Sequence, residues 1–140
     1  MSETPREGEH VLQPAGWARP IGYGHGLVVS GRQILLAGQI GWNPVTAAIE
    51  TDDFAGQVRQ ALSNVVVLLA EAGAMPHHLV RLTWFITDRA EYMASRHAMG
   101  RAYRAVIGSH YPPMTVVVVA GLLDERAKVE IEATAVAPDP

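Results

Sequence analysis

Two carboxylates on one predicted strand are the first candidates for chemistry. In the segment Lys128–Val136 (KVEIEATAV), Glu130 and Glu132 alternate with apolar residues, so both side chains lie on one face of the strand. A carboxylate in a partly desolvated cleft can act as a general acid or base. Alternation alone favours a simpler interpretation, in which both glutamates form the solvated face of an amphipathic edge strand.

An imidazole in a glycine-rich segment is the second candidate. His25 lies two residues after Tyr23 in the segment GYGHG, and because histidine titrates near neutral pH it can serve as a proton shuttle. The alternative is that His25 is an ordinary surface residue. His77 and His78 are adjacent in a predicted loop and lack the spacing of metal ligands, so we expect no metal site there.

Composition excludes several classes of function. The chain has no cysteine, which excludes disulfides, thiolate metal ligands and thiol nucleophiles. Its 11 Lys and Arg against 14 Asp and Glu give a net charge of -3, so no basic excess is available to neutralise nucleic-acid phosphates. The longest apolar stretch, residues 116–123, is too short to span a bilayer, and the polar N-terminus is not a signal peptide. We therefore expect a cytoplasmic protein that binds neither nucleic acid nor membrane.

Periodicity predicts the elements that must position these groups. From Phe54 onward, apolar residues recur at helical spacing after a capping cluster, and Gly73 ends the helix. Two short apolar strands on either side of Ser30-Gly31-Arg32 are expected to form a hairpin. The predicted order is strand 26–30, strand 33–38, helix 54–72, strand 79–87, helix 89–107, strand 114–120 and strand 128–136.

This β-β-α-β-α-β-β order predicts an α+β single domain with both helices on one face of one sheet. We place a flexible N-terminal tail at residues 1–16, the domain at residues 17–137 and a C-terminal tail at residues 138–140. The segment Met114–Ala120, with four consecutive valines, is apolar on both faces, so it belongs to a central strand or to a strand that another subunit covers. The uncovered face of the sheet favours an oligomer.

An ordered set of short pieces, from about Pro20 to Val136, carries a family resemblance. The pieces are Ile21-Gly22, LAGQI (36–40), Asn43-Pro44, Gln57, Ala61, Leu62, Asn64, AGA (72–74), FITD (85–88), Tyr103, Pro112-Pro113 and VEIEATA (129–135). With these pieces the chain resembles the Rid family of reactive-intermediate deaminases, also called YjgF-like and formerly known as L-PSP endoribonucleases. The resemblance implies a homotrimer with a chorismate-mutase-like fold and a ligand cleft between adjacent subunits. It also implies hydrolysis of enamines or imines to carbonyl compounds and ammonia, without a cofactor.

The resemblance also assigns site residues, and one of them departs from the family pattern. In deaminating members an arginine directly after the proline stretch binds the substrate carboxylate, whereas this chain has Met114 there, and a thioether cannot bind a carboxylate. Thr115, next to Met114, is counted with it among the substrate-binding residues. Glu130 matches the acidic residue that orients or activates the attacking water. Gly38 and Gln39 match a segment whose backbone lines the cleft.

Further residues are candidates for the same cleft. Gly24 and His25 align with a tyrosine and a serine of the family, so Tyr23 or His25 is expected to supply a polar ring. Tyr103 matches a family tyrosine, although its position on a helix face also fits a core residue. Trp42 is expected either in the apolar lining of the cleft or as a packing anchor at the subunit interface.

The family resemblance leaves the cation of the cleft unassigned. Arg96, Arg101 and Arg104 lie on one predicted helix, where three positive charges are typical of a solvated face. One of these three, or Arg32, is a candidate to replace the missing arginine, and the sequence does not choose among them. A family asparagine on this helix is also missing, since Gly100 stands at its position.

Three functions fit these observations. The first is hydrolytic deamination of a reactive enamine or imine that is less anionic than the usual 2-imino acid or is anchored by another cation. The second is a non-catalytic small-molecule-binding or pathway-accessory trimer. The third, an endoribonuclease, fits least, because RNA cleavage without a metal needs cationic groups to offset the phosphate charge.

Overall fold

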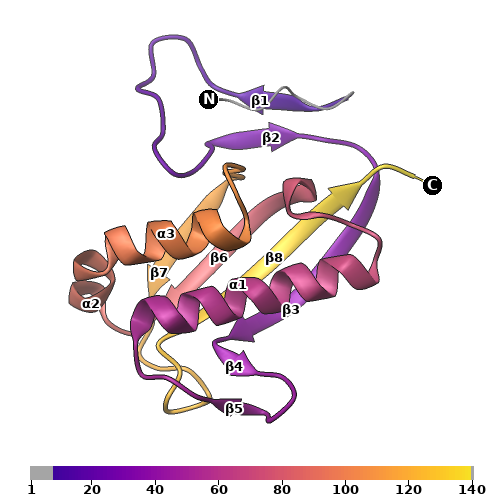
Figure 1. The fold of residues 1–140 in the computed structure, drawn as a ribbon. Helices are drawn as coiled ribbons and strands as arrows, with labels where there is room; N and C mark the ends of the chain where they lie inside the picture. Colours follow the sequence, from indigo (N-terminus) through magenta and orange to yellow (C-terminus); the bar gives the residue numbers. More distant parts are fainter. Residues whose placement is uncertain (1–7, 140) are drawn as a thin grey trace.

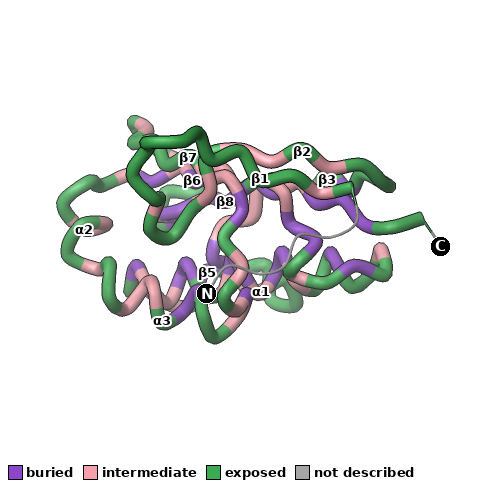
Figure 2. Tube along the Cα trace, turned by 90° about the horizontal axis from the view of Figure 1, so that it is seen from above, coloured by how far each residue is buried: buried purple, intermediate pink, exposed green. Residues whose placement is uncertain are grey.

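A four-stranded sheet with its helices on one face forms the domain. The computed structural model describes residues 8–139. The strands stand in the order β3 (Arg32–Ile40), β8 (Val129–Ala137), β6 (Leu79–Ile86) and β7 (Met114–Val118). Helices α1 (Phe54–Glu71) and α3 (Arg96–Val106) form a layer on one face of this sheet (Figure 1, Figure 2). The predicted α+β class with both helices on one face is confirmed.

Strand β8 lies inside the sheet and pairs antiparallel with both β3 and β6. Strands β6 and β7 pair in parallel, so the chain must cross from one end of the sheet to the other between them. Helices α2 (Arg89–Ala94) and α3 form this connection, as expected because parallel neighbours need a long crossover, usually helical.

Helix α1 begins and ends where its capping residues predict. The Asp53 side chain accepts a hydrogen bond from the backbone N–H of Gly56 at 2.9 Å, which satisfies one of the unpaired donors of the first turn. The helix ends at Glu71 with Ala72 as its cap, and Gly73 follows with a φ of +70°, a conformation that glycine adopts without strain. The residues spaced for one face are buried, as predicted: Phe54, Val58, Ala61, Leu62, Val65 and Leu69.

The predicted helix 89–107 is two helices instead of one. Helix α2 starts at an Asp88 cap and ends at Ser95, whose backbone N–H donates to the carbonyl oxygens of both Glu91 and Tyr92. Ser95 has a φ of -98° and a ψ of 4°, outside the helical range. The chain therefore changes direction at this serine before α3 begins, a break that the apolar spacing does not indicate.

The predicted hairpin between residues 26–30 and 33–38 is wrong. Strand β2 (Gly26–Val28) pairs with β1 (His10–Leu12), and β3 pairs with β8 instead. Gly26 permits the β1 contact, since a Cβ there would lie 3.2 Å from the Cβ of Leu12. Figure 1 shows β1 and β2 as a separate ribbon beside one end of the main sheet.

Part of the predicted N-terminal tail is therefore structured, because residues 10–12 form β1. Residues 1–7 of the predicted N-terminal tail, and Pro140 of the predicted C-terminal tail, lie outside the described residues.

Two further short elements occur in the chain. Strands β4 (Trp42–Asn43) and β5 (Ala48–Ile49) pair around the predicted Asn43-Pro44 turn, and a 3-10 turn, η1, spans Pro76–His78.

The valine-rich strand lies at the edge of the sheet. Strand β7 has a single neighbour, β6, so the predicted alternative of a central strand is wrong. Val116, Val117 and Val118 are 39%, 38% and 53% exposed. Their apolar surface is uncovered in one chain, which keeps the second alternative, cover by another subunit, as a prediction.

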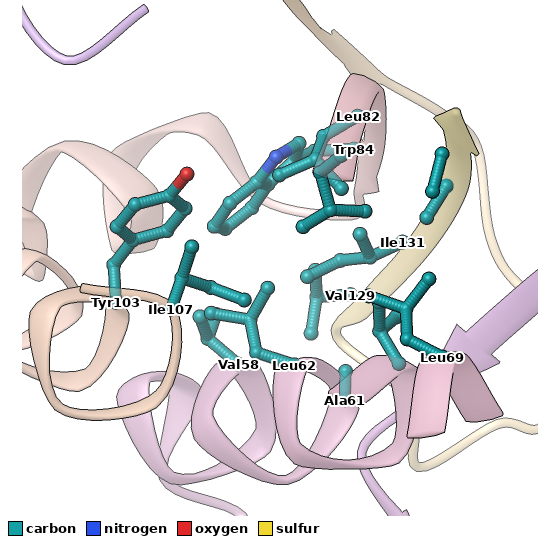
Figure 3. Close-up of a cluster of buried hydrophobic side chains, with 14 of the residues drawn as sticks. Val58, Ala61, Leu62, Leu69, Leu82, Trp84, Tyr103, Ile107, Val129 and Ile131 are labelled. Carbon is teal, nitrogen blue, oxygen red and sulfur yellow. The ribbon is translucent and has the colours of Figure 1, made fainter. Parts of the chain in front are cut away.

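The core lies between the sheet and the helix layer (Figure 3). Buried side chains of α1 and α3 meet those of β6 and β8 there, including Val58, Leu62, Leu69, Tyr103, Leu82, Trp84, Val129 and Ile131. Within the described range 8–139, the structure contains no helix that is both long enough and apolar enough to cross a membrane.

A buried glutamine connects α1 to the loops at one end of the sheet. The side-chain amide of Gln57 donates to the carbonyl oxygens of Thr51 and Arg126, each at 3.0 Å. Its oxygen accepts a hydrogen bond from the backbone N–H of Lys128 at 2.8 Å. The last contact holds the residue directly before β8, so Gln57 helps to fix the position at which Glu130 enters the sheet.

Candidate functional site

Glu130 and Gly38 lie side by side in the sheet. Strand β3 has a register shift between Leu36 and Gln39 where it pairs with β8. A Cβ placed on Gly38 would lie 2.9 Å from both Cγ and Cδ of Glu130, so any side chain at that position would displace the Glu130 side chain. The glycine therefore makes room for the carboxylate, and β-bulges commonly redirect side chains in this way.

Glu130 lies on the open face of the sheet. It pairs in register with Phe85 of β6, whose chain neighbours Trp84 and Ile86 are buried on the helix side. Because successive side chains of a strand alternate and registered neighbours share a face, Glu130 points away from the helices. It is half-buried, whereas Glu132 on the same face is exposed, in agreement with the prediction that Glu132 is solvated.

Met114 lies on the opposite face. It pairs in register with Leu82, a fully buried residue, and packs against the hydrophobic core. Its neighbour Thr115 is exposed on the open face, where it pairs with Thr83. One chain therefore does not bring Met114 and Glu130 together, although the sequence interpretation assigns both to one cleft.

Two other predicted residues are in contact near the end of β3. The indole Nε1 of Trp42 donates to Oε1 of Gln39 at 3.4 Å. The carbonyl oxygen of Trp42 accepts a hydrogen bond from the side-chain amide of Asn64 on α1 at 2.9 Å. Gln39 and Trp42 thus form a small polar contact one residue from Gly38.

Tyr103 has a structural position. It is buried in the core, and its hydroxyl donates to the carbonyl oxygen of His110 at 2.5 Å. Its ring stacks on Tyr111, with centroids 5.1 Å apart and planes 11° apart. These contacts fit the alternative interpretation of Tyr103 as a core residue.

Tyr23 and His25 line a cavity of about 510 Å³. His25 makes edge-to-face contacts with Trp17 and Tyr23, at centroid distances of 5.2 and 5.3 Å. Between them the backbone N–H of Gly24 donates to the carbonyl oxygen of Pro112 at 3.2 Å. This contact brings the Tyr23–His25 segment beside the loop that enters β7. The residues that line the cavity include Pro113, directly before Met114, but not Met114 itself.

His78 of η1 has a structural role. The Nδ1 atom of His78 accepts a hydrogen bond from the backbone N–H of Met75 at 2.9 Å. Throughout the described residues, no group of three or more His, Asp or Glu side chains has an arrangement that could hold a metal ion.

Comparison with known proteins identifies the family of this fold. The family model described as endoribonuclease L-PSP matches residues 18–137. The chain is also 35% identical to 2-iminobutanoate/2-iminopropanoate deaminase of Escherichia coli over 106 residues, which are 76% of this chain and 80% of that protein. The chain belongs to the Rid family. The Rid family is the family that the matching model describes as endoribonuclease L-PSP.

Other relatives agree with this assignment. The chain is 31% identical to Protein DfrA of Myxococcus xanthus over 109 residues, which cover 78% of this chain and 79% of that protein. A Rid-family structure of unknown function, YyfB from Yersinia pestis, has a TM-score of 0.81 and 28% identity, covering 93% and 99% of the two chains. Escherichia coli TdcF, solved with bound serine, has a TM-score of 0.66 and 32% identity, covering 87% and 91%.

In this Rid-family chain, Arg32 is far from Glu130. Arg32 pairs with Ala137 at one end of β3, and Ile40 at the other end pairs with Glu130. At about 3.3 Å per residue these positions are roughly 25 Å apart. The Arg32 guanidinium instead donates to the carbonyl oxygen of Ala72, after α1, at 3.0 Å.

The arginines of α3 have different surroundings. Arg96 donates to the carbonyl oxygen of Met93 at 3.3 Å, and Arg101 is exposed. The Arg104 guanidinium lies beside Gly100, since a Cβ there would be 3.4 Å from its Nη1 atom. Arg104 is thus the arginine of α3 that covers the position of the missing family asparagine.

Sequence reasoning missed Arg19, which lines the cavity with Tyr23 and His25. It also missed the loop residues Ser109 and Tyr111 on the other side of this cavity. The available signal was weak. Arg19 lies two residues before the Ile21-Gly22 piece of the resemblance, but only the β1–β2 pairing and the Gly24–Pro112 contact bring these segments together.

Proposed function

We propose that this protein hydrolyses a reactive imine or enamine to a carbonyl compound and ammonia. The observation that carries the proposal is the half-buried carboxylate of Glu130 above Gly38, on the open face of the sheet. The deaminase name of the Escherichia coli relative gives the same reaction class. The substrate lies against this face, in a cleft that two copies of the chain form together.

Glu130 acts as the general base toward water. As the water oxygen bonds to the imine carbon, the π electrons of the C=N bond move to nitrogen, and Glu130 accepts a proton from the water. The protonated carboxyl then returns the proton to nitrogen. In the resulting carbinolamine, Glu130 accepts the hydroxyl proton and passes it to the nitrogen, so the C=O bond forms as the C–N bond breaks and ammonia leaves. The reaction therefore needs one carboxylate, one water molecule and a bound substrate.

The arrangement of residues supports a cleft between copies. Met114 and Glu130 lie on opposite faces of the sheet, so a single chain does not form a cleft that contains both. The open face carries apolar side chains that are exposed in one chain, including Leu35 at 73% and Val117 at 38%. Burying such surface favours association. A homotrimer, as implied by the family resemblance, is the assembly that we propose.

The substrate is expected to differ from the usual 2-imino acid. A carboxylate needs a cation or several hydrogen-bond donors, and a guanidinium supplies two parallel hydrogen bonds. Met114 supplies neither, and it packs against the core. Uncharged or aromatic imines therefore fit this cleft better, unless another arginine holds the carboxylate.

The test is ammonia release above the spontaneous rate from a panel of freshly generated imines. The panel pairs 2-imino acids with uncharged and aromatic imines that lack the carboxylate. We expect turnover of the uncharged members, a loss of turnover in Glu130→Gln, and retained turnover in the matched control Glu132→Gln, which changes an exposed glutamate on the same face. Absence of turnover across the panel, or full turnover in Glu130→Gln, contradicts the proposal.

A non-catalytic binding trimer is the second candidate. It is favoured by Met114, because the loss of a carboxylate anchor removes part of the positioning on which catalysis depends. The same panel distinguishes the two functions, since a binding protein retains affinity for an imine or its carbonyl product without releasing ammonia. An endoribonuclease is least supported, because the chain has a net charge of -3 and RNA binding needs cationic side chains.

A further inference from the structure

A row of side chains crosses the open face of the sheet at the level of Glu130. Glu130 on β8 pairs in register with Phe85 on β6, and Phe85 pairs in register with Val117 on β7. On the other side of Glu130, its registered partner is Ile40 of β3. Because registered neighbours share a face, these four side chains stand side by side on the face away from the helix layer (Figure 2). Of the four, only Glu130 is polar.

The next row on the same face is polar throughout. It consists of Glu132, Thr83 and Thr115, which pair in register across β8, β6 and β7. A substrate whose reacting carbon lies beside Glu130 therefore has hydroxyl and carboxylate groups on one side and the ring of Phe85 on another. An apolar group of the substrate is better accommodated along the row of Glu130 and Phe85, since it displaces no water from polar side chains there.

Phe85 and Val117 keep accessible surface in one chain. Phe85 is half-buried and Val117 is 38% exposed, and neither belongs to the hydrophobic core of the described residues. The chain neighbours of Phe85, Trp84 and Ile86, are the residues of this strand segment that fill the core. Small-molecule sites are lined mainly by apolar and aromatic side chains around a few placed polar groups. A carboxylate beside a phenylalanine and a valine has this composition.

The spacing of the strands fits a ring attached directly to the reacting carbon. Neighbouring strands are about 4.8 Å apart, so Phe85 lies one strand spacing from Glu130 and Val117 lies two. A phenyl group on the imine carbon extends over roughly one such spacing, from the carbon that water attacks to the ring of Phe85. Aromatic rings pack favourably at centroid distances of about 4.5–7 Å in offset or edge-to-face arrangements.

We propose that Phe85 and Val117 contact the apolar group of the substrate and select imines that carry an aromatic group on the imine carbon. This inference rests on the proposed hydrolysis at Glu130 and adds to it the side chains that recognise the substrate. Glu130 acts on water, while Phe85 and Val117 hold the ring beside it. Binding removes the surfaces of the ring and of both side chains from water, which favours the aromatic substrate.

The test compares the freshly generated imines of acetophenone and acetone, which carry phenyl and methyl at the same position. The readout is kcat/KM for ammonia release, divided by the spontaneous hydrolysis rate of the same imine. We expect the full-length protein to favour the acetophenone imine about tenfold or more, because even one methylene in an apolar pocket changes kcat/KM by about 10- to 200-fold. Phe85→Ala should remove most of this preference, and Phe85→Leu, which keeps an apolar side chain, should remove part of it. Both imines are measured on the same variant, so a general loss of stability or assembly cancels in their ratio.

Val117→Ala and Val118→Ala form a matched pair of variants. Val117 belongs to the row, whereas Val118 pairs with Ile86, which is buried on the helix side. The two substitutions remove the same atoms from adjacent residues on opposite faces. We expect Val117→Ala to lower the preference for the acetophenone imine and Val118→Ala to leave it unchanged. The inference is overturned if the unaltered protein treats both imines equally, if Phe85→Ala keeps the preference, or if both valine variants lose it equally.

Binding of the ketone products separates a failure of this inference from a failure of the proposed function. Acetophenone and acetone are titrated into the protein, and binding is followed by amide chemical-shift changes in residues 84–86 and 116–118. We expect acetophenone to bind more tightly than acetone and to lose this advantage in Phe85→Ala, whether or not either imine is hydrolysed. Equal affinities, or shift changes confined to other residues, overturn the inference. Hydrolysis that Glu130→Gln abolishes, with a ratio that Phe85→Ala does not change, supports the proposed function and overturns the inference alone.

Discussion

The carboxylate of Glu130 lies directly over the backbone of Gly38, where the register shift in β3 faces β8. These residues are far apart in the sequence, and only the β3–β8 pairing brings them together. Any larger residue at position 38 would occupy the space of the Glu130 side chain. Gly38 is therefore part of the candidate site because it has no side chain that would displace the Glu130 carboxylate.

Gly38→Ala should reduce ammonia release without unfolding the protein. The added Cβ would lie 2.9 Å from Cγ and Cδ of Glu130, and because these atoms belong to a flexible side chain, the carboxylate will rotate away. We expect turnover to fall about 10- to 100-fold, the usual effect of misplacing a reacting group by about 1 Å. The melting temperature should fall by about 5 °C or less, the shift for about 1 kcal/mol in a domain of this size.

Gly121→Ala is the control for this substitution, since a Cβ at Gly121 would have nothing within 4 Å. Its turnover and melting temperature should match those of the unaltered protein. Equal turnover in Gly38→Ala and Gly121→Ala would show that the position of Glu130 does not matter to the reaction.

Leu35→Asp should break the proposed trimer. Leu35 is 73% exposed on β3 and pairs with Thr134 on the open face of the sheet. If this face is buried between copies, an unpaired carboxylate there carries a large desolvation cost. Light scattering at micromolar concentration should give a trimer mass for the unaltered protein and a smaller mass for Leu35→Asp.

Val67→Asp provides the matched comparison. Val67 is 62% exposed on α1, so it is an apolar surface residue on the helix layer, away from the open face. We expect this variant to keep the trimer mass. A trimer in both variants, or a monomer before any substitution, would contradict assembly through the sheet.

Local patterns predicted the elements of the domain well, because each element buries a periodic face. The spacing from Phe54 to Leu69 defines α1, and the alternation from Val129 to Ala135 defines β8. Strand β1 was missed because three residues in a polar segment carry no periodic signal, and its pairing with β2 joins distant positions. The same long-range contact forms the cavity, so the role of Arg19 in its lining could not be predicted.

The site was predicted less completely than the fold. A glycine inside a strand pattern is a known sign of a bulge, so the special position of Gly38 had a local signal. The orientation of Met114 had none, because Met114–Val118 is almost uniformly apolar and alternation cannot assign its faces. The register with Leu82 decides that Met114 faces the core, and register depends on the whole sheet.

Gln57→Leu should destabilise the protein strongly. The substitution keeps the size of the side chain but removes three hydrogen bonds, to the backbone of Thr51, Arg126 and Lys128. Gln57 is fully buried, so these backbone groups lose their partner. We expect the free energy of unfolding, from urea titration, to fall by about 2–4 kcal/mol, since each unsatisfied buried group costs about 1–3 kcal/mol.

Gln33→Leu makes the same chemical change at an exposed position on β3. Its free energy of unfolding should change by no more than about 0.5 kcal/mol, as is usual for surface substitutions. If both variants lost the same stability, the loss in Gln57→Leu would come from the leucine rather than from the missing hydrogen bonds.

Tyr92→Phe should make the protein less sensitive to alkaline pH. Burial raises the pKa of Tyr92 above its ordinary value of 10.0, and the nearby positive charge of Arg96 opposes this by lowering the pKa. The ring also packs edge to face on Phe54, with centroids 6.1 Å apart.

In the unfolded chain the tyrosine loses its proton at about pH 10, whereas in the folded protein it keeps the proton to a higher pH. Folding stability from Tyr92 is therefore fully present below about pH 10 and is lost as the pH rises through the raised folded pKa. The measurement is the free energy of unfolding between about pH 9 and pH 12 in the unaltered protein, Tyr92→Phe and Arg96→Gln, where other groups contribute equally and cancel in the differences. Tyr92→Phe should show the smaller loss, and Arg96→Gln should show a larger one, because it removes the charge that lowers the Tyr92 pKa. Parallel curves for all three proteins would contradict the assignment of this pH dependence to Tyr92.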